Sequence, residues 1–132
     1  MPILALYSGI LGLLLVYLSL NVAMNRKKLK IGIGDGENKD MARLIRVQAN
    51  FIEYVPIALI LLAVFESNHG HAMVAHIAGG MLVVGRFLHA YGLGKTVKVS
   101  FGRAAGMVLT WLSILGLAGA NIYYFVMTQV LV

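Results

Sequence analysis

The strongest constraint on the fold is a set of four apolar stretches, each about as long as a membrane's hydrocarbon core is thick. They cover about residues 3–24, 43–65, 72–93 and 104–131. A helix needs roughly 20 consecutive apolar residues to cross a bilayer. The 132 residues are 60% hydrophobic and 12% charged, which is too apolar for a water-soluble domain of this size. We therefore predict one all-α domain over residues 1–132, a transmembrane four-helix bundle.

The links between these stretches predict how the helices connect. Residues 25–40 contain Gly, Asp and Asn residues that interrupt helical periodicity, so we expect an aqueous loop there. The link over residues 67–71 is very short, which predicts that the second and third helices are antiparallel neighbours. Gly102 and Gly106 form a GxxxG pattern near the start of the fourth stretch, and small residues at this spacing favour close helix contacts.

Basic residues gather in two of the three links. They are Arg26, Lys27, Lys28, Lys30, Lys39 and Arg43 in or beside the first, and Lys95, Lys98 and Arg103 in or beside the third. Because cytoplasmic loops collect Lys and Arg, we predict a multi-pass protein with both termini outside the cytoplasm. The basic residues lack the interleaved aromatic residues of a nucleic-acid-binding face, so we expect membrane phospholipids and no nucleic acid as partners.

Two ionisable residues fall well inside the apolar stretches. A charge near the bilayer centre costs at least about 2.5 kcal/mol, so it normally faces the bundle interior and marks a site. Glu53 lies ten residues beyond Arg43, and Arg86 lies nine residues before Lys95, so the two are expected to meet at similar depth. An ion pair that only fixes the register of the helices is the simpler interpretation.

The second stretch carries a polar stripe, which favours a binding site. At about 100° per residue, its polar side chains fall within an arc of about 100°; they are Arg43, Arg46, Asn50, Glu53 and Tyr54. Arginine offers a planar fork to carboxylates, and a carboxylate accepts from an ammonium group, so the stripe suits a zwitterionic ligand with several carboxylates. Gln48 points away from the stripe, toward a different neighbour.

Residues 46–56 (RVQANFIEYVP) resemble the second-helix signature of the MAPEG family, the membrane-associated proteins in eicosanoid and glutathione metabolism. The match is closest to the leukotriene C synthase branch. The segments SLNVAMNRK, GRFLHAYGLGK and FGRAAG are similar to the family's first, third and fourth helices in the same order. The resemblance implies a bacterial-type member in an inner membrane, assembled as a homotrimer with glutathione, its co-substrate, bound between subunits.

The resemblance also implies roles for single residues. The glutathione-binding set would be Arg26, Arg46, Gln48, Asn50, Glu53, Tyr54, Arg86 and His89. Arg103 would be the catalytic residue that faces the sulfur. A free thiol titrates near about 8.5, and a nearby guanidinium can lower that pKa by about 1 to 3 units. The resulting thiolate would attack an electrophile, and since the chain has no cysteine, the sulfur must come from a bound molecule.

The third helix departs from the leukotriene C synthase pattern of two tyrosines four residues apart. His89 stands at the first position and Leu93 at the second, while Tyr91 points about 160° away from Leu93. His89 is also consistent with a core histidine bonded to a backbone carbonyl. The sulfur side of the site is therefore the part that the resemblance defines least.

The leading hypothesis is a glutathione-dependent membrane transferase or peroxidase that acts on a hydrophobic small molecule or lipid. One alternative is a small multidrug-type transporter that uses Glu53 to exchange protons for cations, and another is a glutathione-binding or lipid-binding protein without turnover. His69, His71 and His76 lie near Glu66, but they lack an obvious further ligand for zinc. We expect no metal site.

Overall fold

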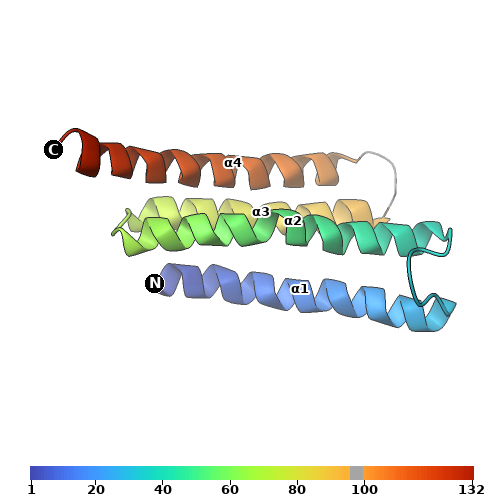
Figure 1. Ribbon diagram of the computed structural model, residues 1–132. Helices are drawn as coiled ribbons and strands as arrows, with labels where there is room; N and C mark the ends of the chain where they lie inside the picture. Colours follow the sequence, from blue (N-terminus) through green and yellow to red (C-terminus); the bar gives the residue numbers. More distant parts are fainter. Residues whose placement is uncertain (96–99) are drawn as a thin grey trace.

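The computed structural model describes residues 1–95 and 100–132, with the side chains of residues 93–95 outside the description. Within these ranges the chain is all-helical, as predicted, and contains no strand (Figure 1). The helices are α1 (Pro2–Leu29), α2 (Lys39–Ser67), α3 (Ala72–Lys95) and α4 (Phe101–Phe125), and α4 ends in a π-helical turn, η1 (Val126–Val130). All four long helices are long and apolar enough to cross a membrane. Lys98 of the third link lies outside the described residues.

The helices extend into polar sequence that the apolar stretches did not include. α1 continues through Arg26, Lys27 and Lys28 and stops at Lys30, whose backbone is left-handed with φ 56°. Cations are favourable at this end of a helix because they oppose its dipole. α2 starts where the Asn38 side chain accepts a hydrogen bond from the Met41 N–H, at 2.9 Å. Capping groups, not hydropathy, therefore determine these helix ends.

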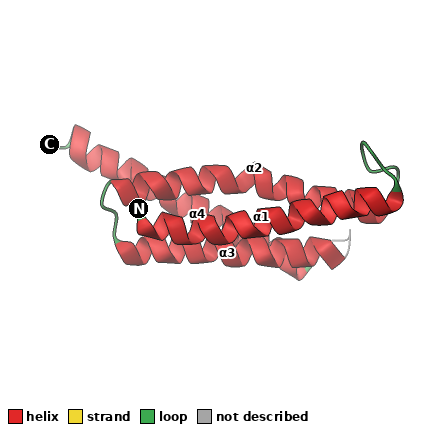
Figure 2. Ribbon diagram, turned by 90° about the horizontal axis from the view of Figure 1, so that it is seen from below, coloured by secondary structure: helices red, strands yellow, loops and turns green. Residues whose placement is uncertain are grey.

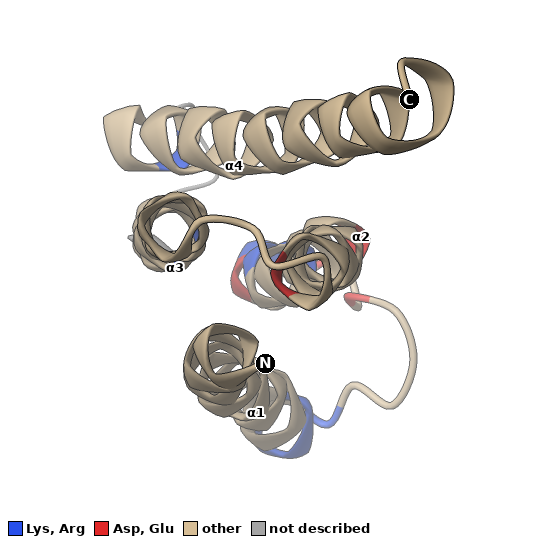
Figure 3. Cartoon of the chain, turned by 90° about the vertical axis from the view of Figure 1, so that its left-hand side faces the viewer, with Lys and Arg blue, Asp and Glu red and all other residues tan. Residues whose placement is uncertain are grey.

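The helices form three layers. Figure 3 looks along the bundle and shows α2 and α3 side by side between α1 and α4. α1 contacts α2 and α3, α4 contacts the same two helices from the other side, and among the described residues α1 and α4 do not touch. The contact between α2 and α3 confirms the neighbouring pair that the short link predicted. α4 crosses the central layer obliquely, and its carboxyl end extends past the rest of the bundle (Figure 2).

The apolar core lies mainly between α1, α2 and α3. Its buried members are Leu11, Leu14, Leu18, Val47, Phe51, Val55, Ala58 and Leu82. A second cluster, of Leu62, Ala75, Ala78 and Leu117, fills the end near the α2–α3 link. The outer surface is apolar as well, with Leu13 76% and Leu115 67% exposed. A surface of this kind is suited to contact with lipid rather than water.

Glycines bring α3 and α4 into close contact, as the GxxxG pattern predicted. A Cβ on Gly106 would collide with the carbonyl oxygen of Gly85 and lie 2.6 Å from the backbone nitrogen of His89. A Cβ on Gly92 would lie 2.5 Å from the backbone nitrogen of Arg103. This contact holds the first turns of α4 against the last turns of α3, next to the polar stripe of α2.

The opposite end of the bundle is closed by two polar contacts. The Glu66 carboxylate accepts hydrogen bonds from the backbone N–H groups of Ile3, at 3.0 Å, and Leu4, at 2.8 Å. The Tyr7 hydroxyl lies 3.0 Å from Nδ1 of His76. Glu66 and His76, two of the four residues considered as metal ligands, therefore have protein partners. No cluster of three or more His, Cys, Asp or Glu capable of holding a metal occurs in the described parts of the chain.

Candidate functional site

The polar stripe occupies the amino-terminal half of α2 and reaches its middle at Glu53. Glu53 is fourteen residues from each end of this helix, which runs from Lys39 to Ser67. The buried face of α2 carries Val47, Phe51 and Val55, which pack into the apolar core. Arg46, Asn50 and Glu53 occupy another face of the same helix, so these polar groups lie within the membrane span without entering that core.

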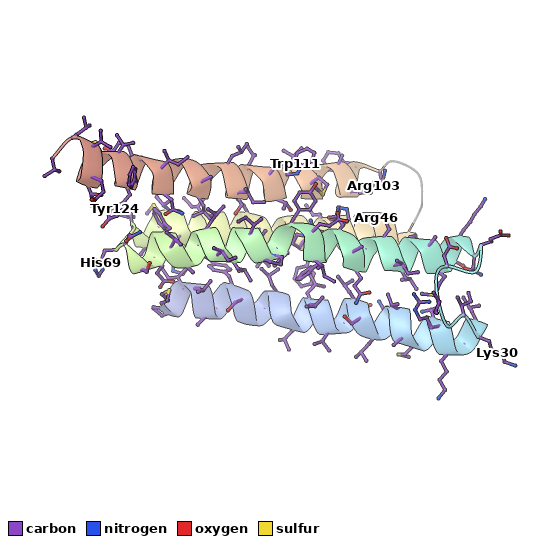
Figure 4. The ribbon with its side chains drawn as sticks, viewed as in Figure 1. Lys30, Arg46, His69, Arg103, Trp111 and Tyr124 are labelled. Atoms are coloured by element: carbon purple, nitrogen blue, oxygen red, sulfur yellow. The ribbon has the colours of Figure 1, made fainter. Side chains whose placement is uncertain are left out.

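Arg46 and Glu53 form an ion pair along this stripe. Nη2 of Arg46 donates to both carboxylate oxygens of Glu53, at 2.7 and 2.6 Å. Seven residues are two helical turns, so the two side chains share one face of α2. The arginine and glutamate side chains are 50% and 49% exposed in the single chain. Figure 4 shows Arg46 at the same end of the bundle as Arg103.

Glu53 does not meet Arg86 as the sequence suggested, because each has a different partner. Nη2 of Arg86 donates to Oδ1 of Asn50 at 2.5 Å, whereas Glu53 is held by Arg46. On α2, Asn50 lies about 60° closer to the buried face than Glu53 does. The amide therefore reaches α3, and the carboxylate stays toward the open side of the stripe.

Arg86 is the most deeply buried charged residue of the site, at 1% exposed. Besides Asn50 it contacts Oγ1 of Thr110, at 3.4 Å, and its guanidinium carbon lies 6.0 Å from the centre of the Phe51 ring. Its Nε is buried without a hydrogen-bond partner among the described residues. None of the described contacts of Arg86 is with a carboxylate. A buried guanidinium whose described hydrogen-bond partners are all uncharged produces a positive potential that favours an anionic ligand.

His89 belongs to the same cluster and is 2% exposed. Its Nδ1 lies 3.3 Å from Nη2 of Arg86. Because arginine only donates hydrogen bonds, Nδ1 is the acceptor in this contact. The simpler interpretation of His89, a core histidine bonded to a backbone carbonyl, would therefore have to use Nε2.

Arg103 lies in the first turn of α4, where its backbone N–H donates to Oγ of Ser100 at 3.2 Å. Three residues later on the same face, Gly106 packs against His89. The α3–α4 contact thus brings Arg103 to within about one turn of the buried cluster around Arg86.

Tyr54 of α2 and Tyr91 of α3 lie on different sides of the α2–α3 layer. Tyr54 is half-buried and follows Asn50 by one turn on the stripe. Tyr91 is 62% exposed and lines a groove between α1 and α3, away from the stripe. The side chain of Leu93, the second departure from the tyrosine pattern, lies outside the described residues.

Arg26 and Gln48 do not join the stripe within one chain. Nε2 of Gln48 donates to Oγ of Ser19 on α1 at 2.9 Å, which confirms that Gln48 points toward a different neighbour. Arg26 donates to the carbonyl oxygen of Gly34 at 2.8 Å and so holds the loop that follows α1.

Sequence reasoning missed Thr110 as a member of the site. Its hydroxyl also donates to the Gly106 carbonyl, at 2.8 Å, and it is fully buried. A signal was present, because Thr110 follows Arg103 by seven residues and Gly106 by four, on one face of α4. The glycine pattern was interpreted for packing alone, so the hydroxyl beside it was not considered.

Comparison with known proteins matches nearly the whole chain. Residues 4–123 match the sequence model of a family described as the MAPEG family. The chain is 34% identical over 120 residues to inner membrane protein YecN of Escherichia coli strain K12, covering 91% of this chain and 90% of that protein. YecN of Escherichia coli O6:H1, strain CFT073, matches to the same extent. These matches include all the helices that form the polar stripe and its neighbours.

Proposed function

The chain belongs to the MAPEG family, and from this premise we propose that it is a glutathione-dependent transferase or peroxidase acting on lipophilic electrophiles. It is an integral, multi-pass membrane protein. The names of its relatives give a membrane location and no activity, so the proposal depends on the chemistry of the site. Within the family we place it nearest the leukotriene C synthase branch, on the motif at residues 46–56.

The observation that carries the proposal is the buried guanidinium of Arg86 without an acidic partner among its described contacts. Keeping this charge inside the membrane is costly unless an anion approaches it. The exposed Arg46–Glu53 pair beside it offers a cation and an anion together. Glutathione carries two carboxylates and an ammonium group, so its charges match those of the stripe.

The same pair supports assembly as a homotrimer with glutathione between subunits. Arg46 and Glu53 are about half-exposed, although Glu53 lies halfway along a membrane span and Arg46 lies two turns nearer its start. Lipid is a poor neighbour for either charge, so protein and ligand must cover them. A second subunit would also bring its own Arg26 and Gln48, which lie away from the stripe within one chain.

In the proposed reaction Arg103 stabilises the thiolate of bound glutathione. The thiol proton passes to water, and the sulfur anion attacks an electrophilic carbon and displaces its leaving group as an anion. With a lipid hydroperoxide, the sulfur attacks the outer oxygen, the O–O bond breaks, and the alkoxide takes a proton from water to leave as the alcohol. The glutathione sulfenic acid that forms then condenses with a second glutathione to give the disulfide and water. A thiolate near a cation at neutral pH is sufficient for both reactions.

Calorimetric titration of glutathione into the detergent-solubilised protein tests binding. We expect Arg46→Gln to weaken the affinity about tenfold or more, since a hydrogen bond to a charged group contributes about 1.5 to 3 kcal/mol. Lys27→Gln removes an equal charge from the end of α1 and serves as the control. If Arg46→Gln and Lys27→Gln bind glutathione equally well, the stripe is not the site.

Conjugation of glutathione to an aryl halide then separates an enzyme from a protein that only binds. Binding without turnover of an aryl halide or a lipid hydroperoxide would leave the non-catalytic alternative. The ion pair weighs against the transporter, because exchange of protons for cations requires a carboxylate that is available to protons and cations. Glu53 is instead held by Arg46 at 2.6 Å.

A further inference from the structure

A second candidate site lies on the other side of the central layer. The α1–α3 groove is a cavity of about 650 Å³ whose floor includes the buried side chains of Leu14, Leu18 and Val47. Its walls include Tyr17 and Tyr91, which are 61% and 62% exposed. Its lining comes from α1, α2 and α3, whereas Arg103 and Thr110 belong to α4. The α2–α3 layer therefore separates this groove from Arg103 and Thr110.

The groove has the length of one membrane leaflet. Its lining on α1 runs from Ile10 to Asn21, which is about 16 Å at 1.5 Å per residue. Half of a hydrocarbon core is about 15 Å. The deep end is formed by aliphatic side chains, whereas Asn21 contributes an amide at the end nearer the basic loop. This arrangement fits a chain that is apolar inside the bilayer and polar at its surface.

Basic residues continue the two faces that line the groove. Lys28 follows Asn21 by seven residues, so it lies two turns further along the same face of α1. Arg43 precedes Val47 by one turn on the face of α2 that lines the groove. Its Nη1 pairs with Asp40 at 2.9 Å, but its buried Nε has no hydrogen-bond partner among the described residues. The mouth of the groove can therefore accept an anion.

We propose that the α1–α3 groove binds an anionic glycerophospholipid, with one acyl chain along the groove and the phosphate beside Lys28 and Arg43. An acyl chain accounts for the apolar, leaflet-long lining, and a negative headgroup accounts for the cations at its mouth. A second copy of the chain fits less well, because the groove has no charged pair that needs a protein cover. That requirement belongs to Arg46 and Glu53, outside the groove. The proposal does not depend on glutathione chemistry.

Fluorescence quenching in vesicles tests the site. The chain has one tryptophan, Trp111, which lies on α4 (Figure 4). The double variant Trp111→Phe, Tyr17→Trp moves the fluorophore to the groove wall, where the native side chain is already exposed. We expect phosphatidylglycerol with brominated acyl chains to associate about fivefold more strongly than brominated phosphatidylcholine at this position. This ratio corresponds to about 1 kcal/mol, the attraction expected of one basic residue near the surface.

Two controls make the result specific. In the native protein the tryptophan fluorescence comes from Trp111, and the two brominated lipids should quench it equally. Added to the double variant, Lys28→Gln should abolish the preference for phosphatidylglycerol, whereas Lys27→Gln, an equal charge about 100° away, should retain most of it. Equal quenching of the double variant by both lipids overturns the proposal. Quenching of the native protein without quenching of the double variant also overturns it, because protein then covers the groove.

Discussion

Burial of the Arg86 guanidinium costs folding free energy, whereas its charge is expected to contribute to glutathione binding. Burial of ionised groups is so costly that replacing a whole buried ion pair with apolar side chains of similar volume is often neutral or stabilising, by up to about 4 kcal/mol. The described hydrogen bonds of Arg86 include no carboxylate that its replacement would leave unpaired. We therefore expect Arg86→Met to unfold in detergent at the same or a higher temperature than the native protein, while its affinity for glutathione falls at least tenfold. Thermal unfolding and calorimetry measure the two quantities.

This pairing of results separates a binding residue from a structural one. If Arg86 only connected α2, α3 and α4 through Asn50 and Thr110, Arg86→Met would lose stability and the affinity would fall only through misfolding. Arg86→Ala is the reference for a cavity, and it should be less stable than Arg86→Met because its truncated side chain leaves the space unfilled.

Arg103 allows a prediction about pH. Without the guanidinium, the pKa of the bound thiol should rise by about 1 to 3 units. The thiolate form then appears at higher pH, so the conjugation rate of Arg103→Ala should reach its plateau at correspondingly more alkaline pH. The ultraviolet absorbance of the bound thiolate, followed during titration, should shift in the same direction. Arg103→Lys keeps a cation, so the pKa of the bound thiol should stay close to its value in the native protein. An unchanged titration in Arg103→Ala would assign the activation to another group.

For single residues, the sequence predicted which polar side chains of α2 share a stripe but not how they pair. Helical periodicity placed Arg46, Asn50 and Glu53 on one stripe, and the structure has them there. Whether Arg46 or Arg86 pairs with the Glu53 carboxylate was not predictable from the sequence. The answer depends on which side chain of α2 faces α3, and Asn50 and Glu53 differ in direction by only about 60° around the helix. Arg26 was assigned by resemblance, and within one chain it holds the loop at Gly34 instead.

Among the elements, the contact between α3 and α4 positions Arg103 and depends on glycine. Gly106→Leu should destabilise the protein by about 1 to 3 kcal/mol or more, as overpacking usually does. Gly116 on the same helix has nothing within 4 Å of an added Cβ. Gly116→Ala should therefore be neutral or stabilising, since alanine is the better helix former by about 1 kcal/mol.

Thermal unfolding of both glycine variants in one detergent makes this comparison. Gly106→Leu should also lose conjugation activity, because α4 carries Arg103 away from His89 when it moves off α3. If Gly106→Leu and Gly116→Ala behave alike, the close contact is not important for the position of α4.

The number and type of the helices were evident from hydropathy, whereas their ends were not. Apolar content reports where a helix is surrounded by lipid, and α1 continues past that limit through Lys27 and Lys28 because a basic carboxyl end is favourable in water too. The oblique path of α4 was also not predictable, since the glycines fix a contact point but not the angle beyond it.

For the whole molecule, orientation in the membrane can be tested directly because the chain has no native cysteine. We propose that both termini and the link over residues 67–71 lie outside the cytoplasm. Asn68→Cys should then react with a membrane-impermeant maleimide in intact cells, whereas Asp35→Cys should react only after the inner membrane is opened. The opposite labelling pattern would reverse the topology.

The capping of α1 by Glu66 has a consequence for biogenesis. The Ile3 and Leu4 amides are synthesised well before their acceptor, which is made more than sixty residues later, at the far end of α2. Until α2 has crossed the bilayer and brought the Glu66 carboxylate to the same side, the N–H groups of the first turn of α1 must bond to lipid headgroups and water. The hydrogen bonds that join α1 to α2 can therefore form only after both helices have crossed the membrane in opposite directions. Correct insertion of α2 is thus a condition for the final position of α1.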